Sequence, residues 1–112
     1  MREVRDMEEF AASQNAIEEI YAERRRQVDS EGWTPEHDDD HRNGELADAA
    51  ACYALSDTGG SIGGLWPWDL SWFKPRDRRR DLIRAAALIV AEIERLDRLP
   101  PPPHTRATGD AK

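Results

Sequence analysis

The chain is short of cysteine, of long apolar runs and of positive charge. Cys52 is the single cysteine, so no disulfide can form within the chain and a reducing compartment such as the cytoplasm is expected. No apolar run approaches the roughly 20 residues of a membrane-spanning helix, and the N-terminal segment is too acidic for a signal peptide. The formal net charge of −7 makes anionic nucleic acids and membrane surfaces poor partners. We therefore expect a soluble intracellular protein that binds neither.

Helical periodicity dominates what is present, and no segment alternates like a strand. We predict an all-α domain over residues 13–99 whose three main helices cover residues 13–30, 43–55 and 77–99. Residues 1–12 are predicted to be a flexible N-terminus, and the Pro-rich residues 100–112 a disordered tail. Only 38% of the chain is hydrophobic, so a single copy has a small core. A homodimer that completes one helical bundle would bury more apolar surface.

Each predicted helix has an apolar stripe that we expect to face the core. Arg24 lies on the first stripe, with Gln27 at its edge and Glu23 just beyond, so these groups either reach out to water or face a polar cavity. The apolar members of the three stripes are Ile17, Ile20, Tyr21 and Val28; Leu46, Ala49, Ala50 and Tyr53; and Leu82, Ile83, Ala86, Ile89, Val90, Ile93 and Leu96, with Ala85 and Leu88 widening the last.

A Gly- and Trp-rich insertion, residues 56–76, separates the second and third predicted helices. Its first part, SDTGGSIGGL, has four glycines and is predicted to be a mobile loop. Its second part, WPWDLSWFKP, has three tryptophans and a phenylalanine. Because such side chains are not stable in water unassisted, we expect this part to cover the helices as a plug or to line a pocket.

The connector SEGWTPEHDDDH, residues 30–41, admits two interpretations. His37 and His41 have the i, i+4 spacing of a helical metal site. However, Pro35 and three consecutive aspartates favour an extended loop, and Asp40 or Asn43 is expected to cap the next helix.

The arginine-rich segment PRDRRRDL, residues 75–82, begins the third predicted helix. Cations oppose the helix dipole there, so they either bind an anion such as phosphate or form a hydrated, salt-bridged helix start. Carboxylates also recur at helical spacing. Glu45 and Asp48 lie one turn apart, and Asp81 and Glu92 lie on one edge of the last helix. They can share a Mg²⁺ ion or form solvated acidic faces.

Together, these segments resemble a known family. The pattern ERRRQ…EGW…H, then an ExxD helix and DLIRAAALIVAEIERLDR, looks like the MazG-like all-α nucleotide pyrophosphohydrolases, especially the small forms encoded by phages and prophages. The resemblance implies Mg²⁺-dependent hydrolysis of nucleoside triphosphates to monophosphates, with four acidic ligands on two helices. It also implies a location in the cytoplasm of a bacterial host.

The sequence departs from the family pattern at one metal ligand. The first acidic pair falls on Glu45 and Asp48, but the second falls on Asp81 and Arg84, so a cation replaces a carboxylate. This lowers the expected affinity for Mg²⁺ and supplies a partner for a phosphate oxygen. The resemblance thus favours binding of a nucleotide without cleavage.

Three hypotheses follow. The first is a protein that sequesters a nucleotide or nucleotide-derived signal, counteracting host defence in a phage setting. The second is a pyrophosphohydrolase with Glu45, Asp48 and Asp81 as catalytic residues. The third is a protein-interaction module without a small ligand. The predicted ligand contacts are Glu23, Arg24, Gln27, Trp33, His37, Trp66, Trp68, Lys74, Arg79, Arg80 and Arg84, and the predicted Mg²⁺ ligands are Glu45, Asp48, Asp81 and Glu92.

Overall fold

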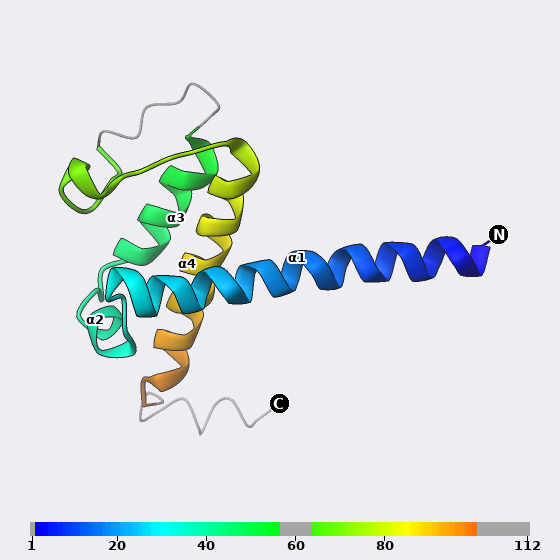
Figure 1. Ribbon diagram of the computed structural model, residues 1–112. Coiled ribbons are helices and arrows are strands. Elements are labelled where there is room, and N and C mark those ends of the chain that lie inside the picture. The colour runs from blue at the N-terminus through cyan, green and yellow to red at the C-terminus, as the bar shows by residue number, and fades with distance from the viewer. Residues whose placement is uncertain (1, 57–63, 101–112) are drawn as a thin grey trace, which may run out of the picture.

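The computed structural model describes residues 2–56 and 64–100, and these residues form helices and no strand. The elements are α1 (Arg2–Glu31), α2 (Pro35–Asp39), α3 (Glu45–Leu55), the 3-10 turn η1 (Leu70–Trp72) and α4 (Arg78–Arg98). Helix α4 contacts α1, α2 and α3, so it forms the centre of the fold (Figure 1). The predicted all-α class is confirmed. The predicted glycine loop, apart from Ser56, Gly64 and Leu65, and nearly all of the predicted tail lie outside the described residues.

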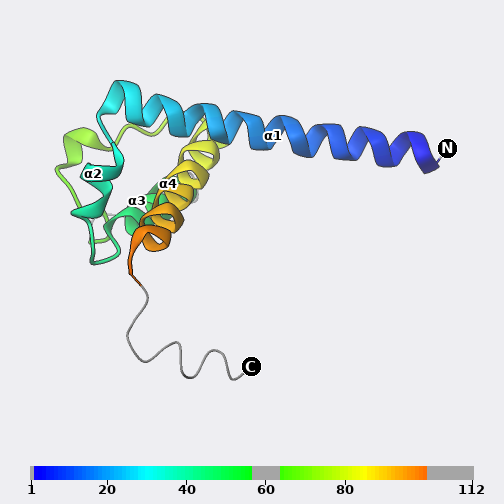
Figure 2. The same ribbon diagram turned by 90° about the horizontal axis from the view of Figure 1, so that it is seen from below.

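Helix α1 is longer than predicted. It begins at Arg2 rather than at Ser13, because residues 3–12 are rich in Glu, Met and Ala and contain no Gly or Pro to stop a helix. Both ribbon views show its N-terminal half extending away from the other helices (Figures 1 and 2). Within the described residues, no helix is both long enough and apolar enough to cross a membrane.

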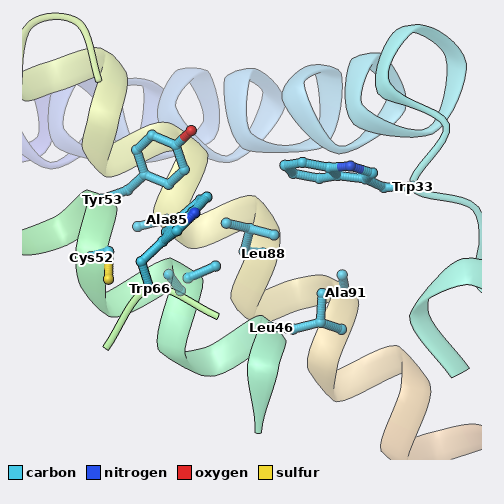
Figure 3. Packing of buried hydrophobic residues seen from close by; sticks show 10 residues of the cluster. Trp33, Leu46, Cys52, Tyr53, Trp66, Ala85, Leu88 and Ala91 are labelled. Atoms are coloured by element: carbon cyan, nitrogen blue, oxygen red, sulfur yellow. The ribbon is translucent and has the colours of Figure 1, made fainter. Parts of the chain in front are cut away.

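The core lies between α3 and α4. The predicted stripe of the second helix is confirmed, because all four of its residues are buried. Trp33 and Trp66 close the two ends of this core, one from the segment after α1 and one from the segment before η1 (Figure 3). The residues of the core are Trp33, Leu46, Ala49, Ala50, Cys52, Tyr53, Trp66, Ala85, Leu88 and Ala91.

The core faces predicted for the first and last helices were partly wrong. Ile17 and Tyr21 are 64% and 63% exposed on α1, and the stripe of α4 centred on Ile89 and Ile93 also faces outward. The side of α4 that packs within the chain is the neighbouring one, around Leu88, where alanines allow α3 to approach closely. Helix α4 therefore has two apolar faces, and the described residues cover one of them.

The helix starts follow local capping. Asp77 caps α4 by accepting the Arg80 N–H, which agrees with the predicted start of that helix. The predicted caps Asp40 and Asn43 were wrong for α3, which begins after Gly44 in a left-handed conformation (φ 86°). Asn43 instead donates its backbone N–H to the Glu45 carboxylate at 2.8 Å.

Candidate functional site

A pocket of about 430 Å³ opens at the end of the fold where α1 stops. Its volume is in the range of small-molecule sites, about 300–1,000 Å³. Three indoles and two imidazoles supply most of its wall, and two carboxylates complete it. The lining residues are Glu31, Trp33, His37, His41, Trp68, Asp69 and Trp72.

The turn after α1 places Trp33 in this wall. Gly32 has a φ of 78°, which a glycine adopts without strain, and it reverses the chain at the helix end. The Trp33 N–H then donates to the Gln27 carbonyl at 3.0 Å, which satisfies an open carbonyl of the last turn. The indole is buried against the core, with its outer side in the pocket.

Helix α2, which sequence analysis had treated as an extended loop, positions the histidines. Thr34 caps it by accepting the His37 N–H at 3.2 Å, and Pro35 occupies its first turn. The fully buried Asp38 accepts hydrogen bonds from Arg24 Nη2 at 2.8 Å and pairs with His37 Nδ1 at 3.0 Å. One buried carboxylate thus connects α1 to α2 and orients an imidazole of the pocket.

The two histidines meet inside the pocket. Their Nε2 atoms are 3.3 Å apart, and His41 lies edge-on to Trp68 with ring centroids 5.2 Å apart. Across residues 2–56 and 64–100, no group of three or more His, Cys, Asp or Glu side chains is arranged to hold a metal ion. The i, i+4 histidines therefore act as part of an aromatic wall in the described structure.

The Trp-rich segment serves both as a plug and as a pocket wall, the two roles that its composition predicts. Trp66 is the plug: its ring lies edge-on to Tyr53 in the core and its Nε1–H donates to the Asp69 carbonyl at 3.0 Å. Trp68 and Trp72 line the pocket instead. Hydrogen bonding from the Ser71 N–H lowers the pKa of Asp69, so this pocket carboxylate is ionised at neutral pH.

Arg84 holds this segment in place. Its Nη1 donates to the Lys74 carbonyl at 2.7 Å and to the Tyr53 hydroxyl at 3.4 Å, and its guanidinium lies over the Tyr53 ring. The same hydroxyl accepts the Lys74 N–H at 3.1 Å. Arg84 does not line the pocket, and its Nε is buried without a hydrogen-bond partner. The structure therefore gives Arg84 a tethering role, whereas the sequence predicted a phosphate contact.

The other predicted arginine contacts also have partners inside the chain. Arg24 binds Asp38, the Trp33 carbonyl and Glu94, while Arg79 pairs with Glu19 at 2.6 Å. Arg80 pairs with the buried Glu23, which also accepts bonds from Arg26 and Gln27. This second group borders a smaller hollow of about 220 Å³, below the usual size of a ligand site.

The ion pairs and hydrogen bonds of Glu23 with Arg26, Gln27 and Arg80 predict that part of the free energy of unfolding is lost in acid. Burial raises the pKa of Glu23, but the hydrogen bond and charge of Arg26, together with Arg80, outweigh it and hold the pKa below its ordinary value of 4.5. A lowered folded-state pKa means that this stabilisation is complete above pH 4.5 and is lost as the pH falls through the folded value. We expect the stability difference between wild type and Glu23→Gln to be constant from pH 7 to 5 and to shrink below that. Urea denaturation at each pH measures it, and a difference unchanged down to pH 3 would contradict the prediction.

The predicted Mg²⁺ ligands have separate partners. Both oxygens of Asp81 are occupied, by the Arg76 N–H at 2.7 Å and the Ser56 hydroxyl at 2.8 Å. Glu92 forms a two-pronged pair with Arg95. Glu45 accepts the Asn43 N–H, while Asp48 is half-buried. These four carboxylates do not converge on one point of the described chain.

Sequence reasoning found part of the pocket. Of the predicted ligand contacts, Trp33, His37 and Trp68 line the pocket. Trp66 and the arginines lie elsewhere. It missed Glu31, His41, Asp69 and Trp72 as lining residues. The Thr-Pro pair at 34–35, a helix-start signal, could have indicated the short helix that carries His37 and brings His41, just beyond its end, close to it. No family model, curated protein or solved structure matches the chain.

Proposed function

We propose that this protein binds and sequesters a nucleotide or nucleotide-derived signal in the aromatic pocket. The observation that carries the proposal is the pocket wall, in which three tryptophans and two histidines surround one ligand-sized space. Planar bases stack on indole and imidazole rings, and each stacked base gains about 1–3 kcal/mol. The motifs that resemble phage MazG-like proteins are consistent with a nucleotide ligand and suggest a signal of host defence.

The polar groups of the pocket favour a particular kind of nucleotide. Glu31, which pairs with Arg26 at 3.1 Å, and Asp69 can only accept hydrogen bonds when ionised, so they suit the amino group of a base or the hydroxyls of a sugar. Asp69 also repels phosphate. Lys74 does not line the pocket, but its Nζ is 5.6 Å from the centroid of the ring of Trp72, a lining residue. A ligand with an amino-bearing base and few phosphates therefore fits better than a nucleoside triphosphate.

Sequestration, rather than hydrolysis, is supported by what the carboxylates do. Asp81 and Glu92 are engaged by groups of the chain itself, and neither lines the pocket. Hydrolysis of a triphosphate needs Mg²⁺ beside the scissile phosphates, which calls for several carboxylates around one point. The pyrophosphohydrolase alternative therefore draws its support from the sequence motifs alone.

The test is binding and turnover measured together. Adenosine, guanosine and cytidine mononucleotides, their cyclic forms and ATP are titrated by calorimetry with and without Mg²⁺, and the nucleotides are then recovered by chromatography. We expect saturable binding of an amino-bearing mononucleotide, tighter than ATP, and recovery of the ligand intact. Trp68→Ala should weaken binding roughly 5- to 150-fold, the equivalent of one lost base stack.

Trp66→Phe is the matched control, because it alters a tryptophan two residues away that faces the core and does not line the pocket. An equal loss of affinity in this control would show that the effect is structural. Turnover abolished by Glu45→Ala would establish the hydrolase instead. No binding of any nucleotide would reject both and leave the protein-interaction module.

A further inference from the structure

Two apolar stripes lie on the outside of the molecule. Four large side chains of α1, at positions 7, 10, 17 and 21, are 63–69% exposed. Four on the outer face of α4, at positions 82, 89, 93 and 96, are 41–51% exposed. We name these the α1 stripe (Met7, Phe10, Ile17, Tyr21) and the α4 stripe (Leu82, Ile89, Ile93, Leu96). Exposed apolar surface of this extent marks an interface.

The two stripes have matching spacing. With Gln14 included, the α1 stripe advances by 3, 4, 3 and 4 residues, and with Ala86 the α4 stripe advances by 4, 3, 4 and 3. Alternating steps of 3 and 4 are the pattern of helices that pack along each other. Read in opposite directions, the two series coincide at all five positions. A parallel arrangement matches only four, after a shift. Each stripe spans 14 steps, or about 21 Å of helix.

We propose that the α1 stripe of each copy packs antiparallel on the α4 stripe of a second copy of this chain. In this register Met7 lies opposite the partner's Leu96, and Phe10 lies opposite the partner's Ile93. The large Ile17 meets the partner's Ala86, a small residue that leaves room for it. A twofold axis then produces two identical seams, because each copy gives one stripe and receives the other.

The second copy is favoured as the occupant for two reasons. The N-terminal half of α1 points away from the other helices in both views (Figures 1 and 2), and Ile17 and Tyr21 stay exposed although Glu19 between them pairs with Arg79 of the same chain. The eight side chains each leave on the order of 100 Å² exposed, and together they approach the ~800 Å² per partner of a standard interface. One chain therefore carries both halves of the seam, matched in length and in spacing. This inference does not depend on the pocket.

Disulfide trapping in the full-length chain tests the register. Phe10→Cys and Ile93→Cys proteins are mixed, oxidised, and analysed by peptide mass spectrometry. We expect a disulfide between positions 10 and 93 of different copies. Cys52 does not interfere, because it is buried and burial, together with Asp48, raises the pKa of its thiol. Light scattering should show a dimer for wild type and at least tenfold weaker association for Phe10→Glu, with Glu9→Gln as the neighbouring control.

Three results would overturn the proposal. If the wild-type protein is monomeric at micromolar concentrations, a second copy is not the occupant of the two stripes. A dominant disulfide from mixed Phe10→Cys and Ile89→Cys proteins indicates the shifted parallel register. A disulfide dimer of Ile89→Cys alone indicates that two α4 helices pack on each other. Circular dichroism of each variant separates loss of association from loss of folding.

Discussion

Replacing Arg24 with methionine is expected to lower the free energy of unfolding by about 3–5 kcal/mol. The carboxylate of Asp38 is fully buried, and Arg24 is its cationic partner at 2.8 Å. Methionine fills much of the space but leaves that carboxylate with the His37 imidazole as its hydrogen-bond partner in the described structure and with the charge of Arg98, which forms no direct ion pair with it. An uncompensated buried charge costs far more than the ion pair contributes, because neither water nor a counter-charge solvates it. Urea denaturation followed by tryptophan fluorescence measures the loss.

An exposed ion pair between neighbouring elements provides the control. Arg98 binds Asp39 at 2.8 Å, with 35% and 50% of the two side chains exposed, so Arg98→Met should cost less than about 1 kcal/mol. The double variant Arg24→Met/Asp38→Leu should recover much of the loss of the single one, because apolar side chains can replace a buried pair. If Arg24→Met costs no more than Arg98→Met, water reaches Asp38 and the buried-charge explanation is wrong.

The same ion pair shows why the sequence could not identify the partners of its arginines within the chain. An arginine on an apolar helix face needs a counter-charge, and the sequence correctly marked Arg24 as unusual. It could not tell whether that charge came from a ligand or from the chain itself. The partners Asp38 and Glu94 are 14 and 70 residues away, so only the folded arrangement reveals them. The partners of Arg84 could not be read from the sequence for the same reason, because they lie on α3 and in the Trp-rich segment.

Local signals predicted the elements better than their packing. Asp77 and the apolar run after it predicted the bounds of α4 to within about one residue, because a helix cap and a periodic apolar stripe are both local features of the sequence. Helix α2 was not predicted, because a helix of five residues is too short to show a helical period in the sequence. The three pocket residues that were predicted, out of seven, are Trp33, His37 and Trp68, and they were predicted from residue type. Trp72 and His41 join it only because the Trp-rich segment folds back so that Trp68 packs against His37 and His41, which no local pattern specifies.

Leu88→Ala should cost about 3–5 kcal/mol at every protein concentration, because it creates a cavity in the packed core. Its neighbour Ile89 is the informative comparison. Periodicity placed Ile89 at the centre of the stripe expected to be buried, yet it is 49% exposed within the chain. In dilute protein Ile89→Ala should therefore cost less than about 1 kcal/mol.

At higher concentration the two neighbours should respond differently. If the α4 stripe is the seam with a second copy, the cost of Ile89→Ala rises with protein concentration, because unfolding is then coupled to dissociation. The cost of Leu88→Ala stays constant, since its contacts lie within one chain. Thermal denaturation over a hundredfold range of concentration measures both. If the costs of both variants stay constant over this range of concentration, the apolar periodicity at Ile89 does not mark an interface. If only the cost of Ile89→Ala rises with concentration, the periodicity correctly predicted a buried face, and that face is covered by a second copy of the chain.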